Sequence, residues 1–291
     1  WLFNAEYPMV SWLERNGYDV SYATHLDTGL HPERLLDHKV FMSSGHDEYW
    51  SQAQRNAVTA ARDSGVNIAF FSGNEMYWRI RYDDAGTPGD QRTMVAYKEG
   101  SLAPSPEGEH RRCYLNFNCD SNSSEWTGLW RESTDATSTQ SRPGSPENAL
   151  TGQISWRNNT SDITVPSDYA SLRFWRNTSV ASLTGTQTAT LTSGSLGYEW
   201  SPQYEQYMGS YPAGRVLLSS TDALSTFAGV DTHHLSLYKA TSGALVFGAG
   251  TFYILRLMWK APLGDDGELE QAPVRAGGIT PAIQMEATGG D

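Results

Sequence analysis

Residues that can transfer protons or bind a metal are concentrated in the segment 45–50, where His46, Asp47 and Glu48 follow one another. In an extended backbone the side chains of His46 and Glu48 point to one side and that of Asp47 to the other. A second polar segment contributes the amide of Asn74. An imidazole and a carboxylate can exchange protons with a substrate and an amide can orient it, so the two segments would form a site if the fold joins them.

The pattern around these residues predicts a strand–helix–strand unit. Residues 39–44 form an apolar run typical of a buried strand, and residues 66–71 form another. Between them, Ser51 and Gln54 have the spacing of a capping box, and Gly65 ends the helix that follows. Strands joined in this way are expected to be parallel, and ligands bind beyond the carboxyl ends of such strands. Both polar segments follow those ends.

Each of these residues also has a purely structural interpretation. Asp47 and Glu48 could be solvated loop charges, or could stabilise the positive end of the helix that begins at Gln52. His46 could be a loop histidine with ordinary hydrogen bonds, and Asn74 could simply form a turn after its strand. Spacing alone leaves these alternatives open.

Residues 1–82 are predicted to be the first part of an α/β domain. Pro8 at a helix start and Gly17 beyond its end predict a short helix, and residues 18–23 alternate between apolar and polar side chains like a strand. This stretch also contains the strand–helix–strand unit.

The sequence pattern changes after residue 82. Residues 83–214 read as loops and a β-rich insertion, with strand-like alternation at 172–175. Buried strands return in residues 215–261 and are expected to complete the first sheet, and residues 262–291 read as a flexible or mismatched tail. The predicted fold class is therefore α/β, a mostly parallel sheet flanked by helices with a β-rich insertion.

Composition excludes several classes of protein. The 291 residues include 21 Lys and Arg against 33 Asp and Glu, a formal charge of −12 at pH 7, so no basic surface for nucleic acid is expected. The longest apolar run, residues 244–255, is too short to span a bilayer. Motifs for a phosphate-binding loop, a serine-hydrolase elbow or a His-Glu-x-x-His zinc site are absent from the sequence.

Two further features concern processing. Cys113 and Cys119 could close a small disulfide loop or be unpaired thiols. The sequence starts at Trp1 without an initiator Met or signal peptide, so we interpret it as a fragment whose compartment, cytoplasmic or secreted, is not indicated.

Several motifs together resemble the large (β) subunit family of N,N-dimethylformamidase. The most specific are Gly-His-Asp-Glu-Tyr-Trp-Ser at 45–51 and Phe-Ser-Gly-Asn-Glu at 71–75. The others are Glu-Tyr-Pro at 6–8, Asn-Gly-Tyr-Asp-Val at 16–20, Trp-Thr-Gly-Leu-Trp-Arg at 126–131, Gly-Tyr-Glu-Trp at 197–200 and Ser-Gly-Ala-Leu-Val-Phe-Gly-Ala-Gly-Thr at 242–251. The resemblance covers roughly residues 3–251.

The resemblance implies an iron-dependent amidohydrolase that cleaves the C–N bond of a small amide. It also implies a domain like that of class I glutamine amidotransferases, which is flavodoxin-like, and it suggests a small subunit and self-association as partners. Neither nucleic acid nor a membrane is expected to bind. Family membership does not fix the substrate.

The resemblance also implies roles for individual residues. The family binds one iron ion through two tyrosines and a glutamate, and the glutamate corresponds to Glu48, with His46 and Asn74 as catalytic partners. Tyr7 is the candidate for one tyrosine, and the other is expected before the first residue of this chain. Glu199 is a weaker candidate for a further active-site acid. Anionic phenolate and carboxylate oxygens suit a hard metal ion.

The sequence departs from the family after Thr251, where a Trp-rich continuation is expected and residues 252–257 do not match. Two other functions remain open. The first is a glycan-binding or glycan-cleaving protein that uses aromatic platforms. The tryptophans of the Ser/Thr-rich region that could serve are Trp126, Trp130, Trp156, Trp175 and Trp200. The second is a non-catalytic amidotransferase-like assembly domain; glutaminase chemistry itself is excluded because no cysteine lies near Gly73.

Overall fold

The computed structural model describes residues 2–98, 120, 122, 124–131 and 144–255. Cys113, Cys119 and the predicted tail 262–291 lie outside these residues. The helices are α1 (Tyr7–Arg15), α2 (His25–Leu30), α3 (Gln52–Asp63) and α4 (Asn148–Thr151), with a π-helical turn at Leu2–Glu6 and 3-10 turns at Pro32–Asp37, Ser167–Tyr169, Arg173–Trp175, Ser179–Ser182, Glu205–Ser210 and Phe252–Leu255. The strands are β1 (Val40–His46), β2 (Tyr49–Ser51), β3 (Asn67–Gly73), β4 (Trp78–Asp83), β5 (Thr93–Val95), β6 (Gly128–Leu129), β7 (Arg157–Asn158), β8 (Thr164–Pro166), β9 (Thr188–Thr190), β10 (Glu199–Trp200), β11 (Val216–Leu217), β12 (Thr221–Ser225), β13 (Gly229–His233), β14 (Ser236–Lys239) and β15 (Leu245–Gly248).

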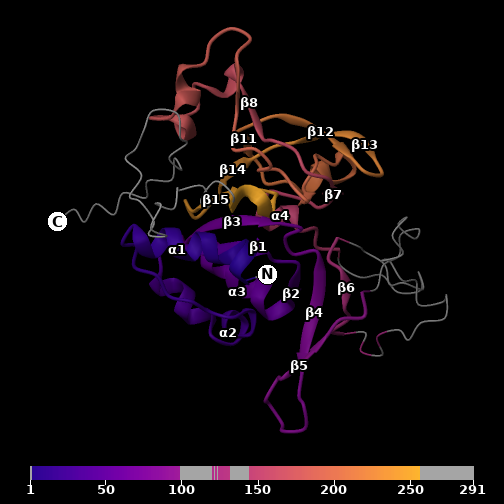
Figure 1. The fold of residues 1–291 in the computed structure, drawn as a ribbon. Helices are drawn as coiled ribbons and strands as arrows, with labels where there is room; N and C mark the ends of the chain where they lie inside the picture. Colours follow the sequence, from indigo (N-terminus) through magenta and orange to yellow (C-terminus); the bar gives the residue numbers. More distant parts are fainter. Residues whose placement is uncertain (1, 99–119, 121, 123, 132–143, 256–291) are drawn as a thin grey trace, which may run out of the picture.

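The central sheet has the strand order β1-β3-β15-β14-β11 and is mixed (Figure 1). β1, β3 and β15 are parallel, whereas β14 and β11 are antiparallel to their neighbours. Outside this sheet, β2 and β4 are parallel and the remaining strand pairs are antiparallel. The fold is therefore rich in β-structure, and the sequence prediction of an α/β fold with a mostly parallel sheet flanked by helices is wrong.

The cause of this difference lies in the connections between strands. A parallel pair needs a long crossover, usually through a helix, whereas an antiparallel pair needs only a short turn. β14 and β15 are joined by the short turn 240–244, in which Gly243 adopts a φ of +95° that favours glycine. Apolar runs at 235–238 and 244–247 indicate buried strands but do not encode their direction.

The unit β1–α3–β3 has the predicted form. The Ser51 side chain accepts a hydrogen bond from the Gln54 backbone N–H and so caps α3. β1 and β3 pair in parallel from Val40 opposite Asn67 to His46 opposite Gly73, as the sequence predicts. The two strands therefore end at the same edge of the sheet.

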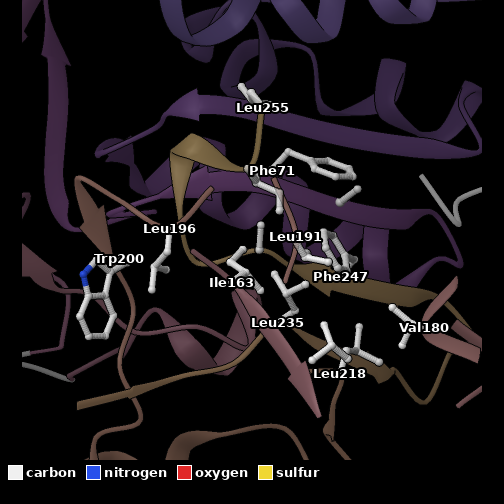
Figure 2. Close-up of a cluster of buried hydrophobic side chains, with 14 of the residues drawn as sticks. Phe71, Ile163, Val180, Leu191, Leu196, Trp200, Leu218, Leu235, Phe247 and Leu255 are labelled. Atoms are coloured by element: carbon white, nitrogen blue, oxygen red, sulfur yellow. The ribbon is translucent and has the colours of Figure 1, made fainter. Parts of the chain in front are cut away.

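Both faces of β3 are buried because its side chains alternate between two cores. Ala69 and Phe71 belong to a cluster covered by residues 160–200, which Figure 2 shows below the sheet. Ile68 and Phe70 belong to a second cluster formed with α3 and Trp50. The alternation follows from the two-residue repeat of a strand, and it fixes which residues can reach the sheet edge.

Two predicted strands do not form. Residues 18–23 are irregular because their side chains bind α1: the Tyr18 ring stacks on Trp12 at 5.5 Å, and the Tyr22 hydroxyl donates to Glu14 at 2.8 Å. Residues 172–175 end in a 3-10 turn, since the Trp175 indole is buried and donates to the Leu218 carbonyl at 2.8 Å. Specific side-chain contacts outweigh the local alternation in both segments.

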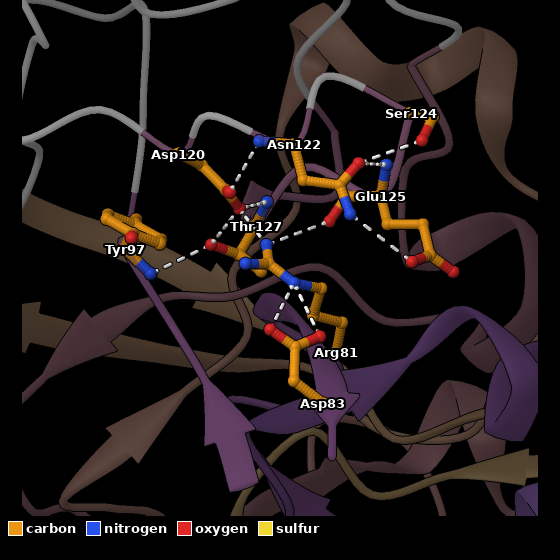
Figure 3. Close-up of polar contacts among 8 residues, drawn as sticks. All are labelled: Arg81, Asp83, Tyr97, Asp120, Asn122, Ser124, Glu125 and Thr127. Carbon is orange, nitrogen blue, oxygen red and sulfur yellow. Dashed lines mark hydrogen bonds and ion pairs between the residues drawn. The ribbon is translucent and has the colours of Figure 1, made fainter. Parts of the chain in front are cut away.

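The hairpin β4–β5 extends away from the central sheet (Figure 1) and is anchored at its base by a polar cluster (Figure 3). The Asp120 carboxylate pairs with Arg81 and accepts from the Thr127 backbone and side chain, each at 3.1 Å. Arg81 also donates to Asp83 at 2.9 Å. Among the described residues, no helix is long and apolar enough to cross a membrane.

Candidate active site

The carboxyl ends of β1 and β3 lie side by side and continue into two loops that are hydrogen-bonded to each other. His46 is opposite Gly73 in the last pair of the parallel register. Beyond it, the Met76 N–H donates to the Asp47 carbonyl at 2.9 Å, and the Trp78 N–H donates to the Glu48 carbonyl at 2.8 Å. The two polar segments are thus held together by the backbone.

His46 lies between two carboxylates in this edge. Its Nε2 is hydrogen-bonded to Oε2 of Glu199, and its Nδ1 lies 3.7 Å from Oε2 of Glu48. All three side chains are mostly buried, each about 14 to 15% exposed. The imidazole also contacts the ring of Phe252 edge-on at 5.2 Å and lies parallel to that of Tyr198 at 6.4 Å. Aromatic groups therefore limit the access of water to the pair of His46 and Glu199.

The pKa of His46 reflects these surroundings. Burial lowers the pKa of the imidazole, but the hydrogen bond and the charge of Glu199 raise it, and the charge of Glu48 raises it further. The net result is a pKa above the usual value of 6.5. A larger fraction of His46 is therefore protonated near neutral pH than of a free histidine, and a protonated imidazole can donate a proton.

Glu199 reaches His46 because the chain approaches β3 very closely there. A Cβ atom at Gly73 would lie 2.8 Å from the Glu199 carbonyl oxygen and 2.7 Å from the Phe252 backbone nitrogen. Trp200 pairs with Thr251 in an antiparallel bridge that fixes the neighbouring backbone. A residue larger than glycine at 73 would push Glu199 away from the site.

Asn74 lies in the loop after β3 with a φ of +50°, a left-handed conformation that asparagine tolerates better than most residues. Its side chain is buried, and its Oδ1 has no hydrogen-bond partner in the part of the chain that the structure describes. A buried polar atom without a partner is costly, and such atoms are common where a ligand binds. The structure places Asn74 in the loop directly after the end of β3, beside the loop of His46 and Glu48.

Behind this group, the other faces of the two loops carry a second polar cluster. Asp47, which could have been a solvated loop charge, is buried and contacts His25, with Nε2 2.8 Å from Oδ1. The Ser43 hydroxyl lies 2.7 Å from Asp47 and 3.2 Å from both carboxyl oxygens of Glu75. Sequence reasoning did not single out Glu75, although its position next to Asn74 was a signal.

The two carboxyl groups of this cluster are shifted in opposite directions. Burial and the Asp47 charge raise the pKa of Glu75 well above its usual value. Burial opposes ionisation of Asp47 as well, but His25 and the hydrogen bond from Ser43 lower its pKa overall. The surroundings therefore favour the neutral form of Glu75 and the ionised form of Asp47.

The iron implied by the resemblance finds one suitable donor here. The Glu48 carboxylate is an anionic oxygen ligand in the centre of the site. The Tyr7 side chain is 45% exposed at the start of α1 and contacts the ring of Phe3 at 6.1 Å. No group of three or more His, Cys, Asp or Glu residues in the described ranges is arranged to hold a metal. Tyr7 as a ligand stays a prediction.

Aromatic platforms for glycans are not apparent in the described residues of the Ser/Thr-rich region. Of the tryptophans proposed for that role, four are buried and one is partly buried. The buried ones are Trp126, Trp130, Trp175 and Trp200, and the partly buried one is Trp156. Their rings fill cores and contact arginines, as Arg79 does over Trp126 at 4.6 Å.

Comparison with known proteins identifies the family of the chain. The sequence model described as "N,N-dimethylformamidase beta subunit-like, C-terminal" matches residues 1–262. Comparison with curated proteins gives no match. Since the match covers most of the chain, including both loops and Glu199, the chain belongs to the N,N-dimethylformamidase beta subunit-like family.

Proposed function

We propose that this chain carries the site that hydrolyses the C–N bond of a small amide. The observation that carries the proposal is the position of His46 between two carboxylates from distant parts of the sequence, next to the loop of Asn74. Glu199 and His46 form a hydrogen-bonded acid–base pair in a mostly buried setting. Family membership supports the same class of reaction at the level of a dimethylformamidase-like protein.

In the proposed reaction water adds to the amide carbonyl carbon, the C–N bond breaks, and the products are a carboxylic acid and an amine. The leaving nitrogen needs a proton, which protonated His46 can deliver because its pKa is raised, and the proton that the attacking water loses returns to the imidazole. Glu199 orients the imidazole through Nε2 and stabilises its charge. The unpartnered Oδ1 of Asn74 can accept a hydrogen bond from the attacking water.

The chemistry that iron would supply when bound is polarisation of the carbonyl and a lower pKa for bound water. Of the residues described, we assign Glu48 to that ion, and the phenolate donors remain predictions. The small subunit and self-association implied by the resemblance also remain predictions. None of the proton-transfer roles above depends on those partners.

The test is the release of amine from a series of formamides and acetamides, including N,N-dimethylformamide, with iron(II) supplied. We expect His46→Gln to lower kcat by about 100-fold or more, the usual range for loss of a general acid. The matched control is His31→Gln, since His31 also lies beside a glutamate, 3.4 Å from Glu33, but on the surface. No amine from any amide, or an unchanged rate in His46→Gln, would contradict the proposal.

Iron content provides an independent measurement. We expect bound iron in the parent protein to fall in Glu48→Gln and to be unchanged in the surface variant Glu33→Gln. Equal iron in the parent and Glu48→Gln would remove Glu48 from the ligand set while leaving the assignment of His46 intact.

A further inference from the structure

The carboxyl pair of Asp47 and Glu75 has no role in the proton transfers described above. Both side chains are almost completely buried, at 7% and 2% exposure. The Ser43 hydroxyl lies within hydrogen-bond distance of both carboxyl groups and so bridges them. Two carboxyl groups that could repel each other are thus held together in the interior.

Each member of the pair is adjacent in sequence to residues of the proposed site. Asp47 lies between His46 and Glu48, and Glu75 directly follows Asn74. The backbone of Asp47 is also held in place, because its N–H donates to the Ser72 hydroxyl at 3.2 Å. Any link between Asp47 and Glu75 therefore fixes one loop of the site against the other.

The loop that carries Glu75 needs such a link. Asn74 and Met76, on either side of Glu75, both have left-handed backbones, with φ of +50° and +54°. Residues with side chains rarely adopt this conformation, and it persists only where the surrounding structure enforces it. The Met76 N–H is held by the Asp47 carbonyl, and the Glu75 carboxyl is held through Ser43.

We propose that Glu75, with Ser43 and Asp47, is a positioning residue that sets the loop of Asn74 against the loop of His46 and Glu48. The inference rests on the proposed function, because these loops carry its acid–base groups. Glu75 does not touch the substrate; it acts through the loop geometry. The contacts support this role, since the Ser43 hydroxyl lies 2.7 Å from Asp47 and 3.2 Å from Glu75, and the Met76 N–H donates to the Asp47 carbonyl.

The test compares two variants. Glu75→Gln is neutral and keeps a hydrogen-bond donor and an acceptor, whereas Glu75→Leu has a similar size and has neither a donor nor an acceptor. A displacement of about 1 Å in a catalytic group can cost about 100-fold in rate, so we expect about that loss of kcat in Glu75→Leu, with KM changed less than about threefold. Glu75→Gln should keep kcat within about threefold of the parent.

A second readout needs no activity. Nitrogen NMR of the imidazoles, with the His46 signals identified by their loss in His46→Gln, reports the surroundings of that ring. We expect the His46 signals to shift in Glu75→Leu and to stay at the parent position in Glu75→Gln. If the parent protein hydrolyses no amide, the proposed function fails, whereas the NMR comparison still decides whether Glu75 positions His46.

Loss of stability alone is controlled by Val180→Ala, a cavity variant in the core below the sheet, where Val180 is fully buried and outside both loops. It should lower stability and leave kcat and the His46 signals unchanged. If Glu75→Leu does not fold, Ser43→Ala removes the bridging hydroxyl and should lower kcat by about tenfold. An unchanged kcat and unchanged His46 signals in Glu75→Leu or Ser43→Ala, or equal losses of kcat in Val180→Ala, would overturn the proposal.

Discussion

Two glutamates are buried almost equally in this protein, and their neighbours have opposite charge. Glu75, at the end of β3, lies against the carboxylate of Asp47 and the hydroxyl of Ser43. Glu147, before α4, pairs with the guanidinium of Arg131, whose Nε lies 3.2 Å from Oε2. Arg131 also lies over the ring of Tyr77 at 5.1 Å. One carboxyl group is therefore in an ion pair and the other is beside a like charge.

Burial alone therefore does not mark a functional carboxyl group. Burial opposes both charges and raises the pKa of Glu147, but the Glu147 carboxylate raises the pKa of the Arg131 guanidinium, and the two groups are hydrogen-bonded to each other, so each charge has a partner. Such a pair has a structural role. Among the described residues no cation forms an ion pair with Glu75, which directly follows Asn74 in the loop beside that of His46. Carboxyl groups whose pKa is strongly raised by burial and a neighbouring carboxylate are found preferentially at functional sites.

The same substitution in the two glutamates should give the largest contrast at Glu147. Glu147→Gln leaves Arg131 buried without a counter-charge, and we expect the free energy of unfolding to fall by about 3–5 kcal/mol. Urea unfolding followed by tryptophan fluorescence measures this loss, with the exposed Glu205→Gln as the control. A loss below about 1 kcal/mol would mean that the ion pair does not stabilise the fold.

Stability near His46 should depend on the close approach of the backbone at Gly73, whereas stability near Arg131 should depend on charge. Gly73→Ala forces a Cβ atom against the Glu199 carbonyl and the Phe252 nitrogen, so we expect a loss of about 1–3 kcal/mol in the free energy of unfolding. Amine release should fall further than stability alone explains, because Glu199 moves. Gly209→Ala, where a Cβ meets nothing within 4 Å, is the control. Equal stability in the two variants would contradict the close approach.

The pH dependence of stability is expected to come from the region of His46 and not from Arg131. The pKa of His46 is raised by folding, so its contribution to stability is fully present below about pH 6.5 and is lost as the pH rises through the raised pKa. His25 adds a contribution of the same sign. The Arg131 guanidinium keeps its proton throughout this range. Burial lowers the pKa values of His233 and His234, and their contributions of opposite sign are complete above about pH 6.5, so stability measured by urea unfolding from about pH 7 to 9 should fall with pH.

In that titration the slope should flatten in His46→Gln and should be unchanged in the surface control His31→Gln. A slope that survives in full in His46→Gln would show that the carboxylates around His46 do not favour its proton in the folded protein.

The smallest effect is expected for Glu75→Gln. Burial raises the pKa of Glu75 and so favours its neutral form, and glutamine needs no proton to become neutral on folding. We therefore expect Glu75→Gln to lower the free energy of unfolding by less than about 1 kcal/mol, or to raise it. The measurement is the same urea titration at pH 7. A loss as large as that of Glu147→Gln would mean that both glutamates are ionised, and the contrast between the two regions would disappear.

The two loops that carry His46 and Asn74 could be predicted from the sequence because the elements that position them are close together in the chain. The apolar run before His46, the cap at Ser51 and the run before Asn74 specify a strand–helix–strand unit, and parallel pairing then brings two loops together. Glu199 could be named only through the family resemblance, since no local pattern links Gly-Tyr-Glu-Trp to His46. Its partner is set by the close packing at Gly73.

The remainder depends on contacts that local patterns do not contain. The antiparallel direction of β14 follows from a short turn to β15, which an apolar run does not reveal. Glu75 looks like an ordinary polar residue until Ser43, in a neighbouring strand, is seen beside it. Residues 18–23 alternate like a strand, yet their aromatic side chains are drawn to α1.

The contact of His46 with Glu199 joins residues 153 positions apart, and this separation has a consequence for synthesis on the ribosome. The loops after β1 and β3 can form soon after residue 78 has emerged, because their strands and helix are close in sequence. Glu199 is synthesised much later, and the backbone next to it is fixed only when Thr251 pairs with Trp200. A nascent chain therefore carries the histidine long before its carboxylate partner, and a prematurely terminated product would hold an incomplete pair. The acid–base group becomes competent only in the last stage of translation of this segment.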